Sequence, residues 1–66
     1  MSLHADLASM QSTLDQLLQR VDEAATQVRG TPRDDLLGDL YEVERHLQGA
    51  ARRLRRALAS LPGETD

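Results

Sequence analysis

The stretch RGTPRDD, residues 29–35, interrupts an otherwise continuous pattern of helical apolar spacing. Gly30 suits the left-handed backbone conformation in which many helices end. Thr31 is a favourable helix N-cap, and Pro32 fits the first turn of a helix, where its missing N–H removes no hydrogen bond. The two aspartates that follow would lie at the positive end of the new helix dipole. The stretch therefore predicts two helices that fold back on each other through a connection of two or three residues.

Apolar residues on both sides of this stretch recur at alternating spacings of four and three, which is the heptad pattern of packed helices. The pattern predicts an all-α antiparallel hairpin, with helices at about residues 3–29 and 32–61, in one domain that spans residues 1–66. Residues 2–61 are expected to be structured and residues 62–66 to form a polar tail. The predicted a positions are Leu7, Leu14, Val21, Val28, Leu40, Leu47, Leu54 and Leu61, and the predicted d positions are Leu3, Met10, Leu17, Ala24, Leu36, Val43, Ala50 and Ala57.

The chain is too short to build a large core by itself. It has 66 residues, no cysteine and a formal net charge of -3. Small domains of this size usually need disulfides, a metal or a partner chain, and the absence of cysteine removes the first of these. The composition thus favours association with another chain.

The two flanks of the predicted heptad seam differ in character. The g positions are polar throughout, whereas the e positions include three leucines and two alanines. Because an a/d seam would leave the e positions without a partner inside the hairpin, they predict a contact with a second chain. A second copy would give a homodimeric four-helix bundle. The predicted interface residues are Leu18, Ala25, Leu37, Ala51 and Leu58.

Four arginines lie within ARRLRRAL, residues 51–58. A solvated helix face near a C-terminus explains them most simply, because cations there favour the helix dipole. Phosphate binding is the alternative, although the acidic net charge argues against a nucleic-acid partner. Its candidate contacts are Arg45, Arg52, Arg53 and Arg56.

A second polar group, His46 with Asp39 and Glu42, has spacing that could ligate a metal ion. A solvated polar face is the favoured interpretation, so no metal and no cofactor are predicted. The chain also lacks a convergent set of catalytic side chains, and we expect it not to be an enzyme.

These features predict a small non-catalytic protein–protein interaction module, such as a dimeric adaptor, scaffold or regulatory subunit. Two alternatives stay open: a nucleic-acid-binding regulator that uses the arginines, and an obligate subunit that docks its apolar flank on a different protein. We expect a cytoplasmic location and no membrane association, because the sequence has neither a long apolar run nor a signal peptide.

Overall fold

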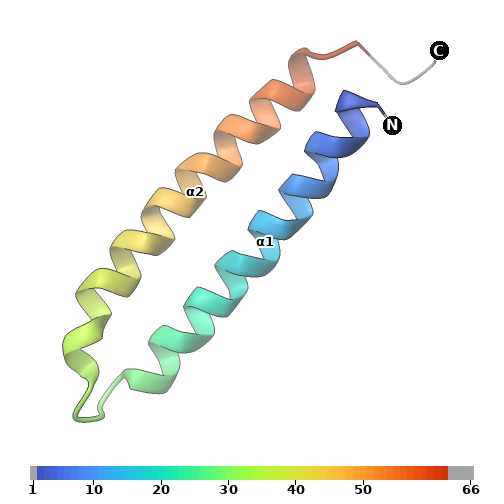
Figure 1. The fold of residues 1–66 in the computed structure, drawn as a ribbon. Coiled ribbons are helices and arrows are strands. Elements are labelled where there is room, and N and C mark those ends of the chain that lie inside the picture. The colour runs from blue at the N-terminus through green and yellow to red at the C-terminus, as the bar shows by residue number, and fades with distance from the viewer. Residues whose placement is uncertain (1, 63–66) are drawn as a thin grey trace.

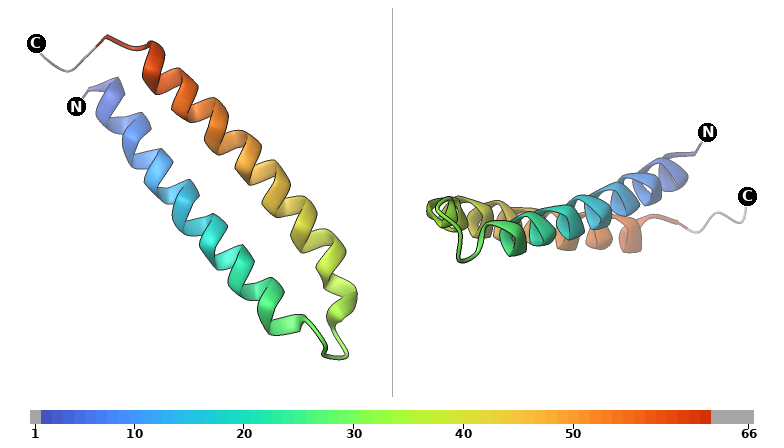
Figure 2. Two further views of the ribbon diagram at one scale, coloured as in Figure 1. Left: turned by 180° about the vertical axis from the view of Figure 1, so that it is seen from behind. Right: turned by 90° about the horizontal axis from the view of Figure 1, so that it is seen from below.

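The computed structural model describes residues 2–62 and has the predicted hairpin of two helices (Figure 1). Helix α1 spans Leu3–Val28, a short 3₁₀ helix η1 spans Asp34–Leu36, and helix α2 spans Leu37–Ser60. The two long helices pack antiparallel along their length, in a layer one helix thick that measures 54 × 16 × 12 Å (Figure 2). No strand occurs within the described residues, and no helix among them is apolar over a length that could cross a membrane. Of the predicted polar tail, residues 63–66 lie outside the described residues.

Both ends of α1 are capped by local hydrogen bonds. The Ser2 hydroxyl accepts the N–H of Ala5 at 3.0 Å, which satisfies one of the free donors in the first turn. At the other end, the Arg29 N–H donates to the Ala25 carbonyl, and Gly30 follows with a φ of +76°. The prediction that Gly30 takes the left-handed conformation is therefore confirmed.

The start of the second long helix was predicted at about residue 32, and this is wrong. The chain passes from residue 31 to residue 36 through i→i+3 hydrogen bonds, from the Asp34 N–H to the Thr31 carbonyl and from the Leu36 N–H to the Arg33 carbonyl. The Thr31 hydroxyl still accepts the Arg33 N–H at 3.1 Å, as an N-cap would, and it also donates to the Val28 carbonyl at 2.6 Å. Tighter 3₁₀ winding thus reverses the chain before α-helical bonding begins at Leu37.

The seam between the helices also differs from the prediction. Its rows are the a and e positions, not the a and d positions, and the only buried residues among those described are the e-position alanines Ala25 and Ala51, each 2% exposed. The reason is the width of the apolar stripe: rows d, a and e together cover about 100° of each helix, and a single neighbouring helix covers only two of them. The residues of this a/e seam are His4, Leu7, Gln11, Leu14, Leu18, Val21, Ala25 and Val28 on α1, and Leu37, Leu40, Glu44, Leu47, Ala51, Leu54, Leu58 and Leu61 on or just after α2.

Antiparallel packing decides which rows share a face of the hairpin. Rows with the same heptad letter lie on the same side of the seam in an antiparallel pair. At 100° per residue, b and d lie on opposite sides of an a/e seam. The d rows of both helices therefore lie together on one face, and the b rows lie together on the other, where the Arg29 guanidinium, just after α1, donates to the Tyr41 hydroxyl at 2.7 Å.

Candidate interaction surface

The d rows form an exposed apolar surface, which we call the open apolar face. Its large side chains keep between 39% and 60% of their area exposed, although Leu, Met and Val are residue types that usually become buried. Near the turn, the d-position residues Ala24 and Leu36 are half-buried. The open apolar face consists of Leu3, Met10 and Leu17 from α1 and of Val43, Ala50 and Ala57 from α2.

The five residues predicted to contact a second chain lie in the a/e seam of the hairpin. Ala25 and Ala51 are buried within a single chain, so neither offers surface to a partner, and their assignment as lacking an intrachain neighbour is wrong. Leu18, Leu37 and Leu58 are half-buried in the same seam. The error came from assuming an a/d seam, which assigned the unpaired row to the e positions. The exposed surface is instead indicated by the d positions, which hold Leu, Met, Val and Ala on the two helices.

Three polar residues interrupt the a/e seam: His4, Gln11 and Glu44 are all half-buried there. The amide nitrogen of Gln11 is 3.5 Å from the Asp15 carboxylate, at the limit of hydrogen bonding. Its Oε1 atom is buried and has no hydrogen-bond partner in the structure. A buried acceptor without a donor costs stability, so the open end of the hairpin is held less firmly than an apolar seam would hold it.

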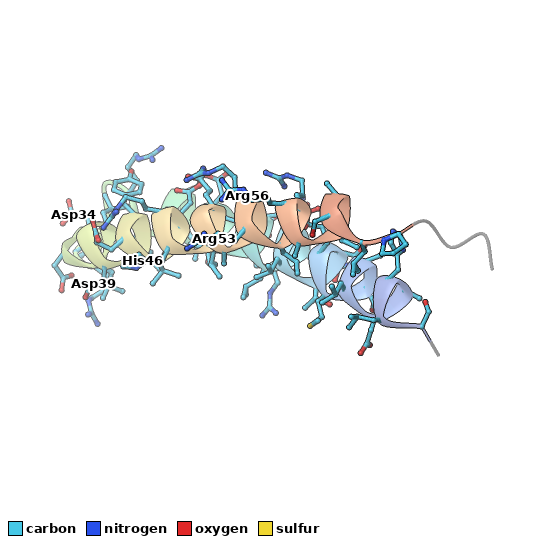
Figure 3. The ribbon with its side chains drawn as sticks, turned by 90° about the horizontal axis from the view of Figure 1, so that it is seen from above. Asp34, Asp39, His46, Arg53 and Arg56 are labelled. Carbon is cyan, nitrogen blue, oxygen red and sulfur yellow. The ribbon has the colours of Figure 1, made fainter. Side chains whose placement is uncertain are left out.

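The four arginines of residues 51–58 form no ion pair with the described residues. Arg52, Arg53, Arg55 and Arg56 are all exposed. Acidic residues lie toward the turn end of α2, and arginines lie toward the open end (Figure 3). The α2 surface therefore changes sign along its length.

Arg45, the fourth residue predicted to contact phosphate, differs from the others because it binds an acid of its own helix. Its guanidinium donates to the Glu42 carboxylate at 2.7 Å. This hydrogen bond, helped by the opposite charges, lowers the pKa of Glu42 and raises that of Arg45. The structure thus places Arg45 in an intrahelical ion pair, apart from the unpaired arginines.

Arg45 also contacts two of the three residues that were considered as metal ligands, namely Glu42 and His46. Glu42 directs a carboxylate oxygen to Arg45, and the same guanidinium is 3.5 Å from the His46 ring nitrogen. No cluster of three metal-ligating side chains occurs within the described residues, and Asp39 is an exposed residue of the first turn of α2.

Comparison with known proteins gives no relative from which a function could be transferred. No protein family, no curated protein and no solved structure matches this chain.

Proposed function

We propose that this chain is a non-catalytic protein–protein interaction module, in which another polypeptide covers the open apolar face. The observation that carries this proposal is the small core of the single hairpin: only two alanines are fully buried within residues 2–62, and the leucines and valines of the a/e seam are only half-buried. Burial of this limited extent provides little stabilisation against the entropy of ordering some sixty residues. Association would supply the missing apolar burial.

The amphipathic pattern supports the same proposal. Three apolar rows per helix are typical of helices in bundles, whereas a two-stranded coiled coil uses only two rows. In this hairpin the third row is the open apolar face, which lies opposite the Arg29–Tyr41 hydrogen bond. A partner that packs on this face would complete a bundle of four helices or a comparable helical assembly.

The proposal is tested by replacing one large side chain of the open apolar face. Leu17→Glu puts a charge into the centre of this surface. The control Gln16→Glu introduces the same charge at the preceding residue, which is exposed. Completing the burial of Leu17, now 39% exposed, is worth about 1 kcal/mol, and an enclosed glutamate adds a desolvation cost.

We expect Leu17→Glu to weaken association at least about tenfold, measured by sedimentation equilibrium and by helicity at several protein concentrations. Gln16→Glu should behave as the wild type. A wild-type hairpin that is monomeric and cooperatively folded, and that Leu17→Glu leaves unchanged, would refute the proposal.

Nucleic-acid binding is the competing function, and the unpaired arginines favour it. The one aromatic residue, Tyr41, is 44% exposed, so an aromatic side chain is present at the surface for base stacking. Its hydroxyl is held by Arg29, and the net charge of -3 opposes binding to a polyanion. We expect the wild type to bind generic RNA only weakly at about 150 mM salt. A variant in which four arginines are changed together to Gln should keep the fold; these are Arg52, Arg53, Arg55 and Arg56. Sub-micromolar affinity that collapses in this variant would promote the competing function.

A further inference from the structure

We propose that the chain covering the open apolar face is a second copy of this protein, docked with its turn at the opposite end of the assembly. This inference rests on the proposed function and names the partner. In this arrangement, α1 packs antiparallel on the α1 helix of the partner, and α2 packs on the partner's α2. A two-fold axis then passes near residues 13–14 of α1.

The apolar row of α1 is complementary to itself in this orientation. Residues of two antiparallel helices face each other when they lie equally far from the axis in opposite directions. Met10 then faces the partner's Leu17, and Leu3 faces the partner's Ala24. These two pairings have a common midpoint, so a single register satisfies both.

The charged residues beside this row match in the same register. Asp6 and Arg20 occupy g positions, which flank the d row, and both are exposed without a salt bridge in the described chain. Their midpoint differs from that of the apolar pairings by half a residue, which is less than about 1 Å of helix rise. Asp6 of each copy therefore faces the partner's Arg20, giving two symmetric pairs of opposite charge.

The α2 row accommodates the same axis. Residues 13–14 of α1 lie level with residues 52–53 of α2, at the same levels that place Arg20 opposite His46, so the axis crosses α2 there. Ala50 then lies nearest the partner's Ala57, because the midpoint of these two residues is about 1.5 Å of helix rise from the axis. Alanine pairs permit close approach of two helices, as small residues do generally at helix contacts. The smaller α2 row thus requires no rearrangement of the larger α1 row.

The orientation with both turns at one end is less favourable electrostatically. It would place Arg20 opposite the partner's His46 and Asp6 opposite the partner's Ser60, which yields no pair of opposite charges. It would also bring together two turn halves, residues 15–47, each with eight acids and four arginines. Opposite ends instead place each acidic turn half beside an open end, whose described residues 2–14 and 48–62 hold one acid and four arginines.

Reversing the charge of Asp6 or of Arg20 distinguishes the arrangement with turns at opposite ends from the arrangement with both turns at one end. Asp6→Arg alone and Arg20→Asp alone should each weaken self-association roughly 5- to 50-fold at low salt, because two exposed pairs change from attraction to repulsion. An equimolar mixture of the two variants should form a heterodimer of near wild-type affinity, since both cross pairs are attractive again. Sedimentation equilibrium gives the affinities, and ion exchange resolves the heterodimer by its charge. Glu23→Arg and Arg55→Asp are matched controls at exposed positions away from the open apolar face.

The outcomes distinguish this inference from the proposed function. If the reversals match their controls while Leu17→Glu still disrupts self-association, the proposed arrangement is wrong and the interaction module stands. If the wild type is monomeric and largely unfolded up to about 100 μM, a concentration at which even a dimer with a dissociation constant of about 40 μM would assemble, the second copy is excluded and a different partner is required. Loss of the reversal effects at high salt, together with recovery in the mixture, is the result that the inference predicts.

Discussion

Ala51 tests the a/e seam most directly, because its side chain is almost completely enclosed. It is 2% exposed, although in this single layer only α1 can cover it. Ala51→Leu adds three carbon atoms at a point where the helices are already in contact. Such overpacking typically costs about 1–3 kcal/mol, because neighbouring side chains and backbone must shift.

This cost converts to a measurable thermal shift. For a domain of this size, 1 kcal/mol changes the melting temperature by about 4–8 °C, so Ala51→Leu should lower it by roughly 5–20 °C. The measurement is circular dichroism at a fixed protein concentration, because association makes the melting temperature depend on concentration. Ala59→Leu makes the same change at an exposed position of α2 and should leave the melting temperature nearly unchanged. An Ala51→Leu variant as stable as this control would show that the helices do not pack through their e positions.

Three further changes test local features of the hairpin. Thr31→Ala should cost about 0.5–2 kcal/mol of unfolding free energy, because the hydroxyl joins the end of α1 to the turn, whereas Thr31→Ser should retain most of it; equal urea midpoints for the two variants would contradict the assignment. Gln11→Leu should stabilise the protein by about 1–2 kcal/mol in urea denaturation, since it removes a buried acceptor that has no donor; a destabilised variant would mean that the amide is satisfied in solution. The pKa of Glu42 is lowered by its hydrogen bond to Arg45, so the stability that this pair contributes is present above the ordinary glutamate pKa of 4.5 and is lost as the pH falls through the lower folded-state pKa. Denaturation of Glu42→Gln should therefore differ from that of the wild type at neutral pH and converge with it in acid.

The helices and their antiparallel order follow from features that act within a few residues. Heptad spacing marks both helices, and a glycine followed by Thr31 and Pro32 marks the reversal, so Gly30 was assigned its positive φ correctly. These signals are local, because periodicity and turn chemistry depend on near neighbours. The start of α2 at Leu37 was missed, because the 3₁₀ bonds of residues 31–36 compete closely with α-helical bonds.

The packing of the two helices was harder to predict, because it depends on their rotation about their own axes. Leu17 and Leu18 are adjacent and identical in type, yet one lies on the open apolar face and the other in the a/e seam. A stripe three rows wide allows either the d or the e row to face the neighbouring helix. The choice depends on how the short turn places α2 beside α1, and the spacing of apolar residues contains no information about it.

Tyr41, whose hydroxyl is hydrogen-bonded to Arg29, can serve as an intrinsic spectroscopic probe of the hairpin. Tyr41 is the only aromatic residue in the chain, so no tryptophan or phenylalanine signal overlaps with it. Its hydroxyl accepts a hydrogen bond from Arg29, which directly follows α1, at the closed end of the hairpin and on the face away from the open apolar face. Its near-ultraviolet absorbance and emission should therefore report whether the two helices are closed at the turn, while far-ultraviolet ellipticity reports total helix. Recording both during dilution would reveal whether the hairpin forms before its partner binds or only together with it.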